Sequence, residues 1–154
     1  MRRKDREKDE SFAFSVIDSA PFCTIGITDG GSVYTVPLSV VRDGRSLYFH
    51  SALEGRKVDM LRSGHSVSLT AVSECCVDQE GYTVRYRSAH ADADVHEIAD
   101  EREKAKALML IIRRFAPDNT RMNPEKYIRA MADKTLVWRL DIISIAGKEN
   151  RQAE

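Results

Sequence analysis

The sequence predicts a mainly β fold, an antiparallel barrel of about six strands with added helices. Short β-branched runs follow one another along most of the chain. Glycine-containing turns, Asp29-Gly30-Gly31 and Asp43-Gly44, join neighbouring runs in the manner of β-hairpins. One short helical pattern interrupts the strands, and a longer helical stretch precedes the last one. Consecutive hairpins of this kind favour a sheet that curls on itself.

The bulk composition indicates one globular domain. A chain of 154 residues is within the usual size of a single domain and long enough to bury a core. Lys and Arg together number 24, as do Asp and Glu, and this balance argues against a general nucleic-acid binder. No apolar run approaches the ~20 residues of a membrane span. We therefore expect a charged N-terminal segment at 1–10, one domain at 11–148 and a C-terminal tail at 149–154.

The chain ends and the cysteines favour the cytoplasm. Residues 1–10 (MRRKDREKDE) carry both charge signs with no apolar stretch after them, unlike a secretion signal. Two of the three cysteines, Cys75 and Cys76, are adjacent, a poor disulfide framework. We expect a protein of the reducing cytoplasm.

The N-terminal half predicts a helix and then three strands. Phe12, Val16 and Ile17 have helical spacing, and Pro21 follows them as a stop. The strands that follow are expected at 22–28, 32–42 and 45–50. Pro37 cannot donate to a sheet ladder, so it indicates a bulge, an edge strand, or a place where something other than a strand lies alongside.

The C-terminal half predicts three helices among three strands. A helix over 54–62 should bury Val58 and Leu61, with Leu53 as a further candidate. Asn123-Pro124 has the chemistry of a helix start. The remaining elements are a strand at 66–72, a polar connection at 73–81, a strand at 82–95, a helix at 97–115, a helix ending near 132 and a strand at 135–145.

Residues 47–62 (LYFHSALEGRKVDMLR) have the pattern of a phosphate cradle. A strand runs into His50 and Ser51, and Gly55, Arg56 and Lys57 open the next helix. Helix N-termini favour anions, and arginine and lysine add charged donors. The alternative is a surface helix start with two solvated cations.

Histidines offer two further readings. His50 is either a core histidine at a strand end or a hydrogen-bonding group for a bound ligand, since it titrates near neutral pH. His90, Asp92, Asp94 and His96 share one face if 82–96 is a regular strand. Imidazoles and carboxylates ligate metals, but alternate residues stand ~6.5 Å apart along a strand. We favour a solvated polar face and expect no metal site.

The motifs together resemble a known family. They are Val36-Pro37-Leu38, the run from Leu47 to Ala52 (LYFHSA), Glu54-Gly55-Arg56-Lys57, Tyr86 with Ser88, the helix of Glu101, Glu103 and Lys104, and Gly147-Lys148. The sequence resembles the FMN-binding split β-barrel proteins related to pyridoxamine 5'-phosphate oxidase, and among them the nitroimidazole-resistance (Nim) branch. The resemblance covers residues 11–148 and implies a six-stranded antiparallel split barrel.

The resemblance also implies a cofactor and its contacts. It implies a homodimer that binds FMN at the subunit interface. Val36, Pro37 and Leu38 would pass beside the flavin ring, His50 and Ser51 would lie at the ring or ribityl chain, Arg56 and Lys57 would hold the phosphate, and Ser88 and Trp138 would add contacts, Trp138 from the partner subunit. Related sequences tend to have glycines where this chain has Asp92 and Asp94, and negative charge is unfavourable beside a phosphate.

The implied activity is that of an FMN-dependent oxidoreductase that reduces small nitro-aromatic compounds with electrons from a nicotinamide donor. FMN would carry the electron chemistry, which suits a sequence without a protein nucleophile or paired carboxylates. His50 is the one catalytic candidate. The alternative is a protein that binds or senses FMN, a deazaflavin or haem without turnover. Neither nucleic acid nor a membrane is expected as a partner.

Overall fold

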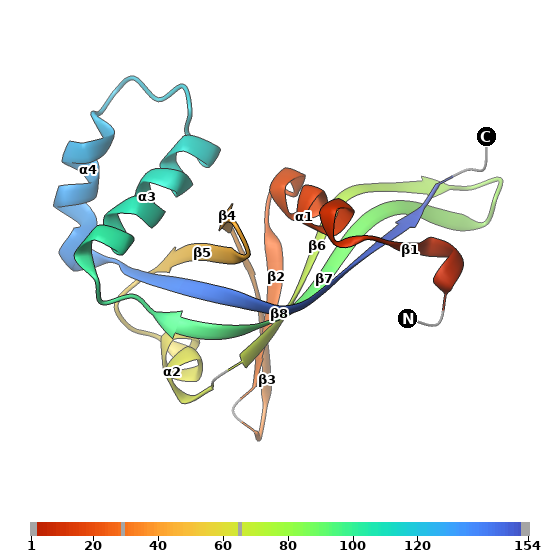
Figure 1. Ribbon diagram of the computed structural model, residues 1–154, viewed down its shortest axis with the longest axis horizontal. Coiled ribbons are helices and arrows are strands. Elements are labelled where there is room, and N and C mark those ends of the chain that lie inside the picture. The colour runs from red at the N-terminus through yellow and green to blue at the C-terminus, as the bar shows by residue number, and fades with distance from the viewer. Residues whose placement is uncertain (1–2, 29, 65, 152–154) are drawn as a thin grey trace.

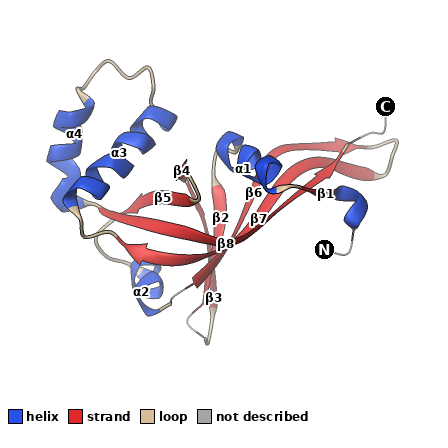
Figure 2. Ribbon diagram, in the orientation of Figure 1, coloured by secondary structure: helices blue, strands red, loops and turns tan. Residues whose placement is uncertain are grey.

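A computed structural model describes residues 3–28, 30–64 and 66–151. Its strands form one antiparallel sheet in the order β3-β2-β6-β7-β8-β5-β4, and β1 pairs with β8. Figures 1 and 2 show α3 and α4 together at one end of the molecule and an extended ribbon of β6, β7 and β8 at the other. The strands are β1 (Glu7–Lys8), β2 (Cys23–Thr28), β3 (Val33–Leu38), β4 (Val41–Asp43), β5 (Ser46–Ser51), β6 (Ser66–Asp78), β7 (Thr83–Glu97) and β8 (Leu136–Asn150).

The predicted mainly β, split-barrel architecture is confirmed. The six expected strands correspond to β2, β3 with β4, β5, β6, β7 and β8, and the short β1 is additional. The predicted strand at 32–42 divides after Leu38, and its second part, β4, forms the hairpin with β5. Gly44 adopts a positive φ of 62° in that turn, which glycine tolerates without strain. Asp29 of the other predicted turn lies outside the described residues.

The helices occupy their predicted places, although α2 and α3 begin later than the expected 54 and 97, and β7 continues to Glu97 before α3. They are η1 (Lys4–Arg6), α1 (Glu10–Ser19), α2 (Arg56–Ser63), α3 (Glu101–Phe115), α4 (Pro124–Met131) and η2 (Ala132–Lys134). Asp9, Asp100 and Asn123 cap α1, α3 and α4, each side chain accepting a hydrogen bond from a first-turn N–H. Leu53 remains 47% exposed, so it is not part of the core. No helix in the described chain is long and apolar enough to span a membrane.

The predicted connection at 73–81 is wrong, because β6 continues to Asp78 and pairs with β7 along its whole length. The pairing register of β6 with β7 shifts between Val72 and Glu74, at the point where the buried part of β6 ends. Beyond it most side chains are exposed on both faces, so the alternation that reveals a half-buried strand is missing. Backbone pairing extends the ribbon, together with ion pairs between its strands such as those of Arg85 with Asp78 and Arg87 with Glu74.

The sheet is covered on two sides, and adjacent residues of β8 show this. Trp138 belongs to the barrel interior with Phe49 and Leu140, and Val137 points to a second cluster formed with α3 and α4. Successive strand residues face opposite sides of a sheet. Both Val137 and Trp138 are therefore almost fully buried, at 0% and 1% exposed.

Candidate functional site

The predicted cradle forms where β5 passes into α2. Gly55 precedes the helix with a φ of 118°, a conformation that favours glycine. No side chain among the described residues caps the start of α2, in contrast to the capped starts of α1, α3 and α4. The first N–H groups of a helix have no partner within the helix. This N-terminus therefore offers backbone donors and a positive dipole end to an anion.

Two cations lie at the same turn, and no acidic residue in the described part of the chain pairs with them. Lys57 is half-buried, and burial lowers the pKa of its ammonium group. The Arg56 guanidinium lies 5.1 Å from the centre of the Tyr34 ring. Neither cation forms an ion pair with any described residue, whereas Arg62 in the last turn of α2 donates to Glu97 at 2.7 and 2.9 Å. The unneutralised charge is confined to the start of the helix.

The contact of Arg56 with Tyr34 brings β3 to the cradle. Tyr34 and Val36 lie on one face of β3, both partly buried against the barrel core. Leu38 is buried, and Pro37 is exposed and paired with Thr24 of β2. Since β3 is at the edge of the sheet, the edge-strand interpretation of Pro37 is confirmed.

His50 stands between the cradle and a pocket. Its side chain reaches solvent, but surrounding protein atoms desolvate it and lower its pKa, and the charge of Lys57 lowers the pKa further. The imidazole is therefore neutral at neutral pH, with one nitrogen donating and the other accepting. Because its side chain is exposed to solvent, His50 is not a core histidine, which was one of the two interpretations from the sequence.

Ser51 and Trp138 meet inside the barrel. Trp138 Nε1 donates to Ser51 Oγ at 2.9 Å, and Ser51 Oγ donates to the backbone oxygen of Ala52 at 2.9 Å. The Trp138 ring stacks on Phe49 with centroids 6.3 Å apart. Ser51 is 5% and Trp138 1% exposed. The indole of Trp138 is therefore buried in the barrel interior against Ser51, so in this chain it is not a surface group.

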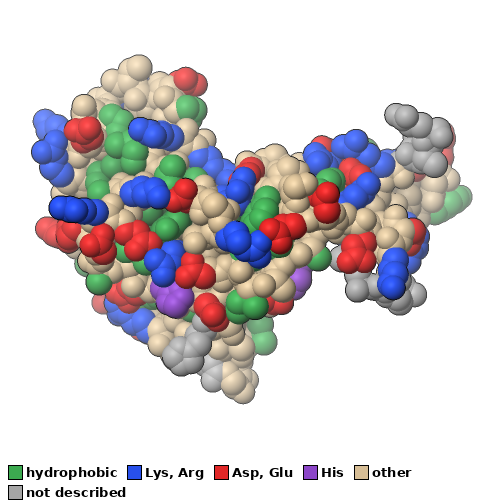
Figure 3. Space-filling view, in the orientation of Figure 1, with side chains coloured by type: hydrophobic (Ala, Val, Ile, Leu, Met, Phe, Trp, Pro, Cys, Tyr) green, Lys and Arg blue, Asp and Glu red, His purple; other side chains and the backbone are tan. Residues whose placement is uncertain are grey.

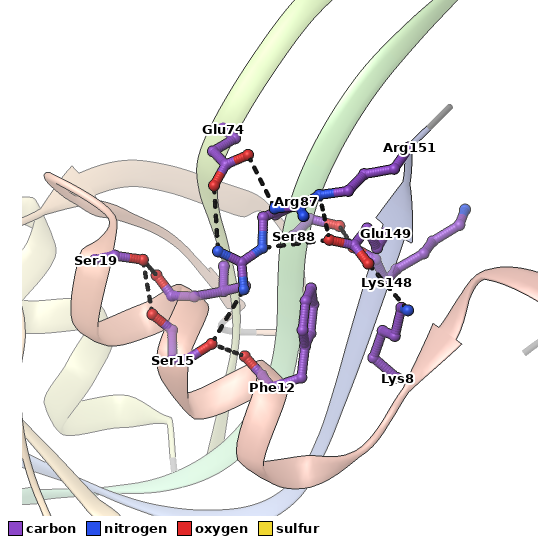
Figure 4. A network of polar contacts seen from close by, with 11 residues as sticks. Lys8, Phe12, Ser15, Ser19, Glu74, Arg87, Ser88, Lys148, Glu149 and Arg151 are labelled. Carbon is purple, nitrogen blue, oxygen red and sulfur yellow. Dashed lines mark hydrogen bonds and ion pairs between the residues drawn. The ribbon is translucent and has the colours of Figure 1, made fainter. Parts of the chain in front are cut away.

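Ser88 lies in a different part of the structure. Its hydroxyl donates to the backbone oxygen of Lys148 at 3.4 Å, next to the ion pairs of Arg87 and Glu149 (Figure 4). None of its contacts within the described chain involves Arg56 or Lys57. The structure thus brings the cradle, β3, His50 and Ser51 together and leaves Ser88 outside.

The polar face of β7 is held by its neighbours. Asp92 accepts hydrogen bonds from Ser68 and Ser144 at 2.5 and 3.1 Å and pairs with His90 at 3.6 Å. His96 pairs with Asp141 at 3.4 Å. The described residues contain no group of three or more side chains that could hold a metal ion. The carboxylate of Asp92 is engaged across the sheet with β6 and β8.

The pocket beside His50 was not predicted from the sequence. It has a volume of about 400 Å³ and lies between α3 and α4, closed on one side by His50 and Thr135. Figure 3 shows hydrophobic side chains gathered over this part of the molecule. Its lining includes Ile111, Ile112 and Ile128. An apolar helical stripe gives the same sequence pattern whether it faces a core or a cavity, so no signal separated the two.

The chain was compared with known proteins. Residues 9–149 match the family model for pyridoxamine 5'-phosphate oxidase. A crystal structure of a candidate 5-nitroimidazole antibiotic resistance protein from Bacteroides thetaiotaomicron is 29% identical, with a TM-score of 0.74 over 92% of this chain and 84% of that one. No curated protein matches the chain.

Two other solved structures share the fold at lower identity. The flavocytochrome Anf3 from Azotobacter vinelandii is 18% identical, with a TM-score of 0.78 over 99% of this chain and 72% of that one. The FAD and haem binding protein from Mycobacterium smegmatis is 20% identical, with a TM-score of 0.79 over 96% and 74%. With a family model matched along nearly its whole length, the chain belongs to the pyridoxamine 5'-phosphate oxidase family.

Proposed function

We propose that the protein binds FMN and works as a flavin-dependent oxidoreductase. The observation that carries the proposal is Lys57, a partly buried cation with no acidic partner in the described chain, at the uncapped start of α2. Burying a cation without a partner is unfavourable unless a ligand supplies the counter-charge. A dianionic phosphate monoester supplies it, and FMN carries one.

The residues present fit the cofactor. Arg56 and Lys57 would hold the phosphate together with the first N–H groups of α2, and Val36, Pro37 and Leu38 would pass beside the ring. Ser51 would act mainly through its backbone, because its hydroxyl is engaged with Trp138 and Ala52. When bound, FMN supplies the electron transfer. The chain supplies orientation, a shielded pocket and the neutral imidazole of His50.

The finer assignments extend this proposal. The resistance protein from Bacteroides thetaiotaomicron supports small nitro-aromatic compounds as the substrate class. We propose a nicotinamide as electron donor, a homodimer with FMN at its interface, and the cytoplasm as the location. Oxidation of NADH or NADPH, followed with and without a nitro-aromatic acceptor, tests the activity. An FMN-loaded protein that oxidises neither donor would contradict the oxidoreductase assignment.

The cradle is tested by removing both cations in the double variant R56A/K57A. Hydrogen bonds to charged groups contribute about 1.5–3 kcal/mol each, so FMN affinity should fall at least about a hundredfold. The matched control is R102A/K126A, which removes the same charge from exposed positions of α3 and α4. FMN titration by fluorescence gives the affinity, and size-exclusion chromatography with light scattering gives the assembly. FMN retention equal to that of the control would reject the cradle.

A second candidate is flavin or haem binding without turnover. The neutral imidazole of His50 beside an apolar pocket is chemically able to ligate a haem iron, and proteins of this fold include a flavocytochrome. The visible spectrum of the purified protein separates the candidates. Flavin bands support the first proposal and a Soret band supports haem. A colourless protein that takes up no added FMN would defeat the flavin proposal.

A further inference from the structure

The pocket between α3 and α4 has the properties of a small-molecule site. Its volume of about 400 Å³ lies within the range of ligand pockets, and its walls are mainly aliphatic and aromatic side chains. Phe115 and Tyr127 contribute the aromatic groups. Apolar walls of this kind suit an aromatic ring, which buries a large area without losing internal freedom.

The polar groups of the pocket select for negative charge. None of the described residues that line it is acidic. Arg121 lines it from the loop between α3 and α4, and it makes no ion pair with any described residue. Asn119 and Tyr127 add further hydrogen-bonding groups. A guanidinium is a planar fork of donors that matches a carboxylate in bidentate geometry.

We propose that this pocket binds a small aromatic carboxylate, with its ring between α3 and α4 and its carboxylate paired with Arg121. The pocket and the cradle meet at His50, which lines the pocket and lies within the electrostatic reach of Lys57. The bound ring would therefore lie next to the place proposed for the flavin. As an assignment of the substrate, this inference rests on the proposed function.

Filling the pocket is the first test. Isothermal titration calorimetry of the full-length protein with 4-nitrobenzoate measures binding directly, with and without added FMN. A116F adds a ring at a residue that lines the pocket, and A105F adds the same ring at an exposed position of α3 outside it. We expect 4-nitrobenzoate affinity to fall at least about tenfold in A116F and to stay unchanged in A105F. Wild-type protein that does not bind, or equal affinities in the two variants, would overturn the inference.

Removing the charge is the second test, and it remains available if A116F fails to fold. R121Q should weaken 4-nitrobenzoate at least about tenfold and leave nitrobenzene unaffected, whereas the exposed control R102Q should change neither. Equal binding of 4-nitrobenzoate to R121Q and R102Q would reject the role of Arg121. Calorimetry measures the heat of 4-nitrobenzoate binding and does not depend on flavin absorbance. A failure of the pocket proposal can therefore be distinguished from a failure of the proposed FMN binding. Protein that binds 4-nitrobenzoate but never FMN contradicts the proposed function and supports the pocket.

Discussion

The buried pair of Ser51 and Trp138 gives the sharpest test of how the cradle is supported. In S51A the indole N–H loses its acceptor at a site where Trp138 is 1% exposed, so water cannot replace the hydroxyl. A buried donor left without a partner costs about 1–3 kcal/mol. The second bond of the hydroxyl, to Ala52, adds little, since Ala52 is exposed and its oxygen can turn to solvent.

The free energy of unfolding should therefore fall by about 2 kcal/mol, which lowers Tm by about 4–8 °C in a chain of 154 residues. Urea unfolding followed by circular dichroism measures the loss. The control is S66A, which removes an exposed hydroxyl of β6 that bonds to no described residue and should change stability by less than about 0.5 kcal/mol.

A double-mutant cycle with W138F separates the hydrogen bond from other effects of S51A. W138F removes the N–H, so S51A should cost much less in that background, with a coupling energy of about 1–2 kcal/mol. An S51A variant as stable as S66A, or one whose cost is unchanged by W138F, would refute the reasoning.

Four further predictions concern the pKa of His50, the pH dependence of stability, packing and a tertiary hydrogen bond. Lys57→Met should raise the pKa of His50, followed by NMR titration, because it removes a repelling charge; an unchanged pKa would leave burial as the only cause. Since the pKa of His50 lies below its ordinary 6.5, the unfolded chain binds more protons, and stability should fall as pH drops through 6.5 toward the lowered value. Gly147→Ala would place its Cβ 2.6 Å from Phe12 Cδ1 and should cost about 1–3 kcal/mol in urea unfolding, a loss that a smaller residue at position 12 should reduce. Arg114→Met removes bonds of 2.8 Å to two carbonyl oxygens at the C-terminal end of α1 and should cost about 1–3 kcal/mol; a thermal melt equal to wild type would contradict it.

Much of the fold was predictable because local chemistry fixed it. Asn123 followed by Pro124 specified the start of α4, and its side chain caps the helix as expected. The alternation around Trp138 specified a strand with a buried face. In α3, Ala105 is exposed and Ala107 is buried, although both are the same residue type, because only tertiary packing orients a helix that has apolar residues on several sides.

The site was predictable in part for the same reason. The Gly55-Arg56-Lys57 triplet located the start of α2 from sequence. Three other features of the site depend on residues that are distant in sequence. These are the absence of acidic partners for the two cations within the described chain, the contact of Arg56 with Tyr34, and the burial of Trp138. Spacing along one strand carries no information about such contacts, so the sequence did not reveal that Ser88 bonds to the backbone of Lys148 or that Trp138 is buried against Ser51.

The ribbon of β6, β7 and β8 has a consequence for how the molecule opens. Its outer part has few buried side chains, and at its base Glu149 joins Lys8, Arg87 and Arg151 at 3.0, 3.5 and 2.8 Å. Surface ion pairs weaken as salt rises, while the barrel core does not depend on them. In hydrogen exchange the amides of residues 73–86 should therefore open in small local fluctuations that become more frequent with ionic strength, while those of β2 and β5 exchange only through global unfolding. The barrel, including the cradle, would therefore stay folded under conditions in which the outer part of the β6, β7 and β8 ribbon already opens locally.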